Sequence, residues 1–205
     1  MIITISRETG SGGHTIGQML AEKLGYRFYD KEIVAEVAKE MNLDEATVLE
    51  NGETMSDKTY FDRASGYIPF SRKSRIPFDE IKEKQDQLIK KIAEDDNCII
   101  VGRGADDILK NYPNVFHIFI HANMEHRVAR VQRHDHVSGQ ESRIRRELEV
   151  KDQSRAMYYN YFTGKKWGRV ENYNLCIDTS LFSKTQSMEM IIYALNKLQE
   201  GKTNA

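Results

Sequence analysis

The sequence is poor in several features that would each point to a class of protein. Two cysteines in 205 residues are too few for a disulfide framework, and Cys98 and Cys176 both stand in apolar, strand-like runs typical of small buried side chains. The net charge of −1 gives no general attraction to nucleic acids or membranes, so neither is an expected partner. No apolar run approaches the ~18 residues of a membrane helix. The first residues form a strand pattern and not a signal peptide, so we expect a cytoplasmic protein.

What the sequence does contain is an alternation of short apolar runs and helical periodicities. Its length and its 40% of hydrophobic residues suit a single domain. Strands are expected at 1–6, 27–29, 98–101, 115–120 and 174–177, and helices at 16–24, 33–41, 44–51, 78–93, 107–111 and 188–198. Strands that alternate with helices predict an α/β fold, with a five-stranded parallel sheet and helices on both faces.

The first strand leads into a glycine-rich loop, and a helix follows. Glycines let consecutive backbone N–H groups turn inward, and the helix adds the positive end of its dipole. We expect six residues of this loop to hold the phosphates of a nucleotide: Gly10, Ser11, Gly12, Gly13, His14 and Thr15. The alternative is a glycine-rich turn without a ligand.

The loop fits the phosphate-loop pattern G-x-x-x-x-G-K-[ST] only in part. Gly13 matches the second glycine and Thr15 matches the hydroxyl that ligates magnesium. Glu8 stands where the first glycine belongs, and His14 stands where the lysine belongs. Histidine is shorter than lysine and mostly neutral near pH 7, so phosphate binding is better supported than efficient transfer.

A dinucleotide-binding fold also opens with a strand, a glycine loop and a helix. Its pattern G-x-G-x-x-G is matched by Gly10 and Gly12, but Thr15 stands in the third glycine place. In this alternative Asp30 would hold the ribose.

Two polar groups follow expected strands and are candidates for a second ligand. Tyr29 and Asp30 come at the end of the strand at 27–29, although Asp30 is equally well placed to cap the next helix. Arg103 follows the apolar run at 98–101, and ligands of parallel sheets bind at the carboxyl ends of strands. A plain surface role is the alternative for Arg103.

Two further segments stand out. The polar stretch at 52–77 fits neither a helix nor a strand, and it is expected to be either a binding loop or a surface insertion. Between Arg127 and Arg169 there are eleven Lys/Arg against five Asp/Glu, an arrangement that can neutralise a triphosphate, although charge runs are usually solvated faces. Aromatic residues in that stretch are expected to pack against the body more than to bind single-stranded nucleic acid. His134-Asp135-His136 is not expected to bind a metal.

Taken together, these landmarks resemble the cytidylate kinase-like family of P-loop nucleoside monophosphate kinases. The resemblance covers nearly the whole chain, and an arginine-rich helix and four stretches carry it: ISRETGSGGHTIG at 5–17, FYDK at 28–31, GRG at 102–104 and IDTS at 177–180. It implies a three-layer P-loop fold with an acceptor-binding insert at about 44–84 and an arginine-rich helical lid at about 127–169.

The resemblance also implies roles for single residues. The loop would hold the donor triphosphate with Thr15 near Mg²⁺, while Asp30 and Arg103 would face the acceptor nucleotide. Arg130 resembles a lid arginine on the donor side. Asp152 and Arg155 match the last two positions of a lid motif in which Leu148 replaces the first arginine. With His14 in the lysine place, Arg7 or an arginine of the lid is a candidate to supply the missing charge.

The expected function is therefore transfer of the γ-phosphoryl group from ATP to a small acceptor such as CMP or dCMP, with Mg²⁺ as cofactor. The candidate catalytic residues are His14, Arg130, Asp152 and Arg155. Two alternatives stay open, namely a nucleotide-binding regulatory protein with little transfer activity and a dinucleotide-dependent oxidoreductase.

Overall fold

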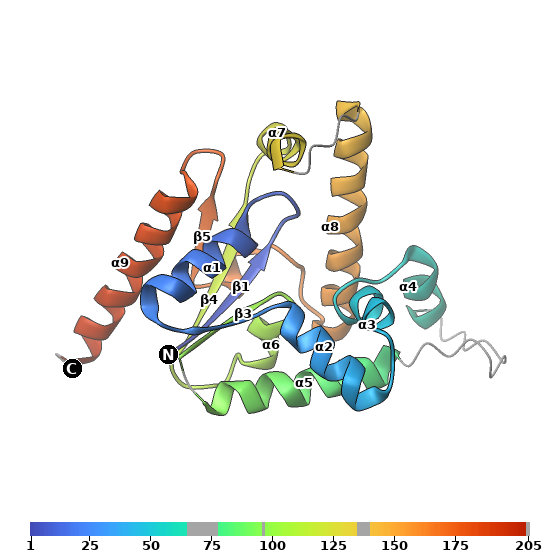
Figure 1. Cartoon of the computed structure of the whole chain (residues 1–205), viewed down its shortest axis with the longest axis horizontal. Coiled ribbons are helices and arrows are strands. Elements are labelled where there is room, and N and C mark those ends of the chain that lie inside the picture. The colour runs from blue at the N-terminus through green and yellow to red at the C-terminus, as the bar shows by residue number, and fades with distance from the viewer. Residues whose placement is uncertain (65–77, 96, 135–139, 204–205) are drawn as a thin grey trace.

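A computed structural model describes residues 1–64, 78–95, 97–134 and 140–203 (Figure 1). Its five strands form one parallel sheet in the order β2-β3-β1-β4-β5. They are β1 (Ile2–Arg7), β2 (Arg27–Tyr29), β3 (Cys98–Val101), β4 (Val115–His121) and β5 (Leu175–Asp178). The expected parallel α/β sheet is thus confirmed, and both cysteines lie in strands as free thiols.

The helices follow the strands in the expected alternation. They are α1 (Gly13–Leu24), α2 (Lys31–Met41), α3 (Glu45–Gly52), α4 (Asp57–Ala64), α5 (Phe78–Glu94), α6 (Ala105–Ile108), α7 (Met124–His134), α8 (Glu141–Thr163) and α9 (Lys184–Thr203), with a 3₁₀ turn at Val170–Asn172. The prediction that 52–77 lacks a helix is wrong for α4, and the short helix expected at 107–111 begins earlier, at Ala105. Residues 65–77 lie outside the described part.

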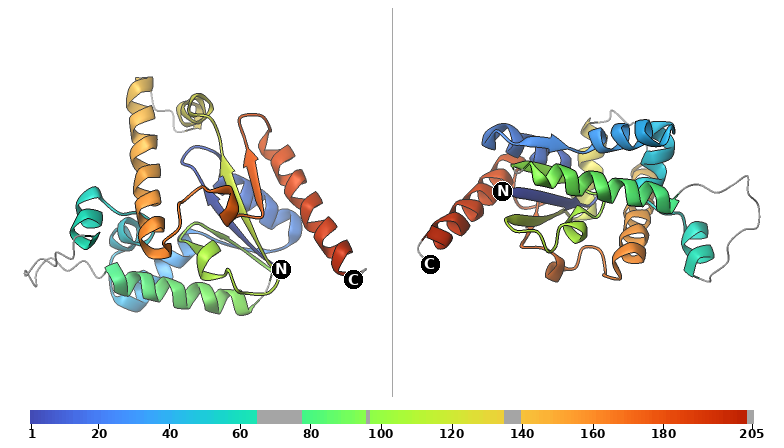
Figure 2. Two further views of the ribbon diagram at one scale, coloured as in Figure 1. Left: turned by 180° about the vertical axis from the view of Figure 1, so that it is seen from behind. Right: turned by 90° about the horizontal axis from the view of Figure 1, so that it is seen from below.

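The sheet is buried on both faces, and its strands therefore carry nearly continuous apolar runs. Along β1, Ile2 packs with α2 and α5 on one face, whereas Ile3 and Ile5 pack with α1 and α9 on the other. The same alternation in β3 places Ile100 with the first group and Ile99 with the second. The result is three layers, with α9 along the β5 edge of the sheet (Figures 1 and 2).

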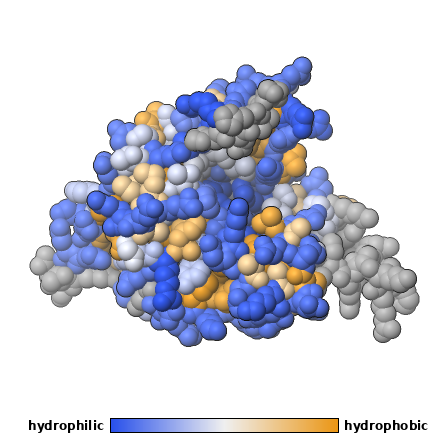
Figure 3. Space-filling view, in the orientation of Figure 1, coloured by the Kyte–Doolittle hydropathy of each residue, from blue (hydrophilic) through white to orange (hydrophobic). Residues whose placement is uncertain are grey.

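The face shown in Figure 3 is mostly hydrophilic, and its apolar patches are small and separate. Along the described ranges, no helix is both long and apolar enough to cross a membrane.

The strand order locates a ligand site. β1 lies between β3 and β4, and the chain runs to one side of β1 through β2 and β3 before it crosses to β4 and β5. Ligands of open parallel sheets bind at the carboxyl ends of the strands, where the order reverses. In the dinucleotide fold the first two strands are neighbours, but here β3 separates them, so the dinucleotide hypothesis is not supported.

The two arginine-rich helices α7 and α8 pack on each other and on the body. Val128 of α7 meets Ile144 and Leu148 of α8 in a small apolar cluster. Further along α8, Tyr158 packs against Met55 and Phe78. Most aromatic residues of this stretch are therefore packing residues, as expected. Figure 1 shows α8 standing beside the sheet with α7 near one of its ends.

Candidate active site

The loop between β1 and α1 has the conformation that its glycines permit. Gly10 and Gly12 have φ of 80° and 90°, values that favour glycine, and Gly12 is the N-cap of α1. The hydroxyl of Thr179, after β5, donates to the Ser11 carbonyl over 2.7 Å, and the Ser11 hydroxyl donates to the Glu8 carbonyl over 2.8 Å. One hydrogen bond from the segment after β5 and one within the loop therefore fix its conformation, and the N-terminus of α1 follows it.

A cavity of about 610 Å³ lies against this loop, within the usual range for small-molecule sites. The loop forms one wall, α7 and α8 form another, and the first residue of α9 completes it. Its lining comprises Arg7, Glu8, Thr9, Gly10, Gly12, Gly13, His14, Thr15, Arg130, Val131, Ile144, Glu147, Leu148, Lys151, Arg155 and Lys184. Apart from His14, five of these side chains are basic and two are acidic. We call it the donor cavity.

Two of its basic groups crowd one another. Arg130 donates from Nη1 to the Ser11 carbonyl over 2.8 Å, which fixes it above Gly12. Partial burial lowers the pKa of Arg130, and burial together with the Arg130 charge lowers the pKa of Lys184. An anion bound in the donor cavity would relieve both effects.

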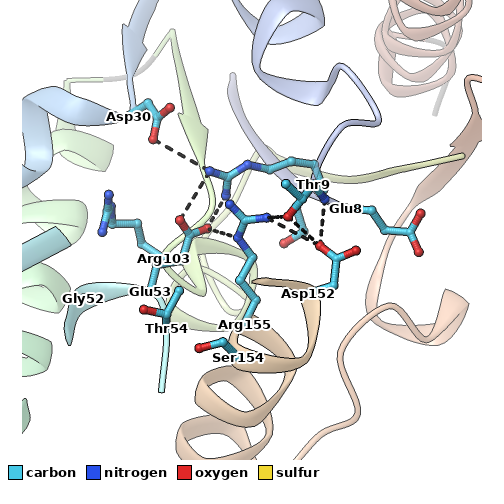
Figure 4. Close-up of polar contacts among 12 residues, drawn as sticks. Glu8, Thr9, Asp30, Gly52, Glu53, Thr54, Arg103, Asp152, Ser154 and Arg155 are labelled. Atoms are coloured by element: carbon cyan, nitrogen blue, oxygen red, sulfur yellow. Dashed lines mark hydrogen bonds and ion pairs between the residues drawn. The ribbon is translucent and has the colours of Figure 1, made fainter. Parts of the chain in front are cut away.

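Asp152 ties α8 to the loop. Its Oδ1 accepts hydrogen bonds from the backbone N–H and the hydroxyl of Thr9, both over 2.7 Å, and its Oδ2 pairs with Arg127. Arg155, one turn along α8, donates to the Thr9 hydroxyl over 2.6 Å. Asp152 and Arg155 face Thr9 from the same side of α8 in Figure 4.

Next to the donor cavity, Glu53 lies in a group of arginines. It forms a bidentate ion pair with Arg7, and Arg155 Nε lies 3.7 Å from its Oε1 (Figure 4). Burial alone would raise the pKa of Glu53, but the charges of Arg7, Arg155 and Arg103 outweigh it and lower that pKa to about 2. Glu53 is therefore a carboxylate at neutral pH.

A second cavity surrounds this group and has room for about one water molecule, about 10 Å³. We call it the small cavity. It is lined by Ser6, Arg7, Glu53, Gly102, Arg103, Gly104, Arg155, Tyr158, Tyr159 and Trp167. Arg7 and Arg155 line both cavities, so these two arginines mark the junction between them.

Arg103 is fully buried, at 1% exposure, in the small cavity. It follows β3 with a φ of 61°, and its Nη1 donates to Gln85 over 3.3 Å, while Gln85 donates to the Gly52 carbonyl. The Nε groups of Arg103 and Arg155 are buried and find no hydrogen-bond partner within the described residues. A plain surface role for Arg103 is therefore wrong, and its charge is available to an anion in this cavity.

Asp30 faces the same region and does not cap α2 through its side chain. It stands at the N-cap position, but its Oδ2 lies 2.7 Å from His14 Nδ1, and Arg7 Nη2 lies 3.9 Å from its Oδ1. The His14 ring meets Phe28 edge-on at 5.3 Å. Tyr29 packs against the core cluster and is not among the residues that line either cavity.

The structure also locates the remaining residues that the sequence analysis singled out. Thr15 lines the donor cavity from the first turn of α1. Leu148, in the lid position where the family motif has an arginine, is buried in the apolar contact of α7 and α8. His134-Asp135-His136 lies outside the residues whose side chains the structure describes. In the described ranges, no three His, Cys, Asp or Glu side chains gather closely enough to hold a metal ion.

Three functional candidates had escaped the sequence analysis. Nothing in the sequence indicates what Thr9 and Glu53 contact, because their partners are 143 and 46 residues away. Lys184 could have been found, since it begins the helix that follows the carboxyl end of β5.

The geometry joins a loop of backbone donors, a basic cavity and a group of buried arginines at the carboxyl edge of a parallel sheet. Structural comparison agrees with this class of fold. The chain resembles a shikimate kinase from Bacteroides thetaiotaomicron with a TM-score of 0.55 and 14% identity over 98% of each chain. It also resembles a gluconokinase from Sinorhizobium meliloti with a TM-score of 0.53 and 14% identity, over 98% of this chain and 94% of the other. The fold is that of the P-loop kinases.

Sequence comparison narrows the class. The profile of the cytidylate kinase-like family matches residues 2–181, and the chain belongs to that family. A protein named cytidylate kinase from Methanosarcina acetivorans is 24% identical over 97% of this chain and 98% of its own length. An uncharacterized protein from Eubacterium ventriosum has a crystal structure that matches with a TM-score of 0.71 and 28% identity, over 96% of this chain and 98% of the other. Family and fold together support a nucleotide kinase.

Proposed function

We propose that this protein transfers the γ-phosphoryl group of ATP to a small anionic acceptor, most simply the phosphate of CMP or dCMP. One observation carries the proposal. A basic cavity large enough for a nucleotide lies against the glycine loop and meets, at Arg7 and Arg155, a small cavity that buries Arg103. Transfer between two anions needs this arrangement, with a donor on one side and an acceptor on the other.

On the donor side, the backbone N–H groups from Gly10 to Thr15 and the N-terminus of α1 would hold the triphosphate. Arg130 and Lys184 would add charge at the far wall of the donor cavity. The hydroxyl of Thr15 would contribute to a site for Mg²⁺, which supplies charge neutralisation on the phosphates. ATP use also fits the cytoplasmic location that the sequence led us to expect.

On the acceptor side, Arg103 and Arg155 would bind the acceptor anion. Asp30, oriented by its contact with His14, would take a polar group of the acceptor, with Tyr29 beside it. An acceptor phosphate is already ionised, so no general base is needed. Its oxygen attacks the γ-phosphorus, the bond from that phosphorus to the bridging oxygen breaks, and ADP leaves with the electron pair.

Asp152 has a different task in this proposal. Because it binds Thr9 through the backbone and the side chain, it fixes the lid over the loop and orients Arg155. Catalysis then consists of positioning and charge neutralisation.

ATP consumption against a panel of nucleoside monophosphates with Mg²⁺, with ATP binding measured in parallel, tests the proposal. We expect turnover with one pyrimidine acceptor above all others. Absence of ATP binding would contradict the assignment of the loop itself.

A second function is favoured by two observations. Leu148 is buried where the family motif has an arginine, and Glu53 already occupies the arginines of the small cavity. Both would suit a protein that binds a nucleotide and transfers little. Tight ATP binding without turnover on any acceptor would support this regulatory alternative.

A further inference from the structure

The proposed function leaves one question about the phosphate loop. Loops of this kind normally carry a lysine that reaches the β- and γ-phosphates. Here the first turn of α1 begins with Gly13 and His14, and His14 Nδ1 is engaged 2.7 Å from Asp30. The cation that would face the transferring phosphoryl group must therefore come from elsewhere.

At Gly13, the first residue of α1, the Arg7 side chain leaves no room for a side chain. A Cβ at residue 13 would lie 2.6 Å from the Cβ of Arg7 and 3.1 Å from its Cγ. These atoms are the root of the Arg7 side chain and cannot swing away as a flexible tip could. The stem of Arg7 thus runs through the volume where a side chain of the first helical residue would start.

The guanidinium of Arg7 lies at the junction of the two cavities, because Arg7 lines both of them. Its side chain is 11% exposed and is held by Glu53, with Asp30 3.9 Å away. Gly102, with a φ of 76°, leaves room for it, since a Cβ there would overlap Arg7 Nη1 and Glu53 Oε1. Burial lowers the pKa of Arg7, but the charges of Glu53 and Asp30 outweigh burial and raise it, so the group is a permanent cation.

The other basic groups of the site are placed differently. Arg130 is bound to the Ser11 carbonyl on the far side of the loop, and Lys184 lies beside Arg130. Arg155 also reaches the junction, but it comes from α8, outside the sheet. Arg7 is the last residue of β1 and enters the site from the rigid centre of the sheet.

We propose that Arg7 supplies the cation that a lysine of the first helical turn supplies in an ordinary phosphate loop, and that it contacts the γ-phosphoryl group as this group passes to the acceptor. This rests on the proposed function. In the step itself an acceptor oxygen bonds to the γ-phosphorus, the bond to the bridging oxygen breaks, and ADP takes the electron pair. Arg7 neutralises charge on the γ-phosphoryl oxygens and gives up no proton. Glu53 releases Arg7 when the nucleotides bind.

The test removes the cation at residue 7 and restores one on the first turn of α1. Arg7→Ala should lower turnover by about 100-fold or more, which is the usual cost of one lost charge-stabilising donor. Gly13→Lys cannot restore the cation, because its Cβ would lie 2.6 Å from the Cβ of residue 7, which alanine keeps. The double variant Arg7→Ala/His14→Lys should recover at least tenfold over Arg7→Ala, since residue 14 stands in the lysine place of the loop pattern and lines the donor cavity. Arg169→Ala, which removes an exposed arginine, is the matched control and should behave as wild type.

A binding measurement adds a readout that needs no acceptor. Arg7→Ala should reduce the ratio of MgATP to MgADP affinity, because the two ligands differ by the γ-phosphate alone. A merely structural role for Arg7 would weaken both ligands equally. Arg7→Lys should retain part of the wild-type ratio.

The Arg7→Ala variant leaves Glu53 with one partner fewer and can fail to fold. Arg7→Ala/Glu53→Gln removes both charges of the pair. Its turnover and its ratio of MgATP to MgADP affinity are then compared with those of Glu53→Gln. The proposal is overturned if loss of Arg7 changes neither turnover nor the affinity ratio, or if the folded Arg7→Ala/His14→Lys variant is no better than Arg7→Ala. A wild-type protein that binds no ATP would overturn the proposed function together with it.

Discussion

The two cavities of the site lie side by side and share two arginines, yet they are filled in opposite ways. The donor cavity, of about 610 Å³, is built from a backbone loop and from basic side chains that repel one another. The small cavity, of about 10 Å³, is occupied by the protein's own ion pairs, with Glu53 at their centre. The proposed donor side is thus preformed, while the proposed acceptor side is closed by a carboxylate.

This difference has a physical consequence. Buried arginines without an anion would be costly, because desolvation of a charge is repaid only by a close partner. Glu53 is such a partner for Arg7 and Arg155. Another anion could replace Glu53 as the partner of these arginines. Among the residues that the structure describes, no ion pair joins Arg130 or Lys184 to a carboxylate. A triphosphate bound in the donor cavity would therefore displace no carboxylate from these two cations.

The largest effect is expected where α8 joins the loop. Asp152→Ala removes the closer of the two carboxylates that face Arg127, whose side chain is only 8% exposed, and leaves Glu8 at 3.7 Å. It should lower the free energy of unfolding by about 3 kcal/mol. Urea unfolding of Asp152→Ala, Arg127→Ala and the double variant measures both the loss and the coupling.

Asp95→Ala is the control for that experiment. Its ion pair with Arg27 is exposed on both sides, so the loss should stay within about 1 kcal/mol. If Asp152→Ala behaves like Asp95→Ala, α8 is not fixed to the loop by this contact, and the donor cavity has no stable outer wall.

The second effect tests the carboxylate of the small cavity. The pKa of Glu53 is about 2 in the folded protein, below its ordinary value of 4.5, so its charge stabilises the fold at any pH above 4.5. That contribution is roughly 3 kcal/mol and is lost as the pH falls from 4.5 towards 2. The slope of unfolding free energy against pH in this window should therefore be shallower in Glu53→Gln than in wild type.

Glu40→Gln controls for the loss of a paired but exposed glutamate and should leave the slope unchanged. The same Glu53→Gln protein should gain more thermal stability from inorganic phosphate than wild type does, because three arginines have lost their anion. Equal gains from phosphate in the two proteins would mean that Glu53 does not occupy an anion site.

The third effect separates the two cavities kinetically. Arg103 lines the small cavity and not the donor cavity, so Arg103→Ala should raise the KM for the acceptor by roughly 10–100-fold, the loss of one charge-assisted contact. The KM for ATP should change by no more than a few-fold. Arg103→Lys is a second variant for the case that the alanine variant is unstable, and the reverse order of effects would move Arg103 to the donor side.

Much of this arrangement could be predicted from the sequence, for identifiable reasons. Apolar runs such as 98–101 are continuous because β3 is covered on both faces, and that pattern reveals a parallel sheet. The loop at 10–15 and Arg103 were found because both follow strands, and the carboxyl ends of parallel strands meet at one edge. The first rule uses the local pattern of side chains and the second uses the order of strands and helices along the chain. Both can be read from the sequence.

What the sequence could not show are contacts between distant segments. Asp30 has the position of a helix cap, and only the fold shows its carboxylate turned to His14. Glu53 stands in a polar stretch without periodicity, and its role arises from Arg7 and Arg155, which come from a strand and from the lid. Helix α4 was missed in the same stretch because it is short and its residues are mostly polar.

The smallest effect concerns the far wall of the donor cavity and mirrors the result expected for Arg103. Lys184→Ala removes one partly exposed cation, so ATP affinity should fall by up to about 1 kcal/mol, or roughly three- to five-fold, with the acceptor KM unchanged. Because this contact is open to solvent, the difference between the variant and wild type should shrink as salt is raised. Lys197→Ala, which alters an exposed lysine further along the same helix, is the matched control. If Lys184→Ala raised the acceptor KM as well, the two cavities would not act as separate binding sites, and the division between a preformed donor side and a closed acceptor side would fail.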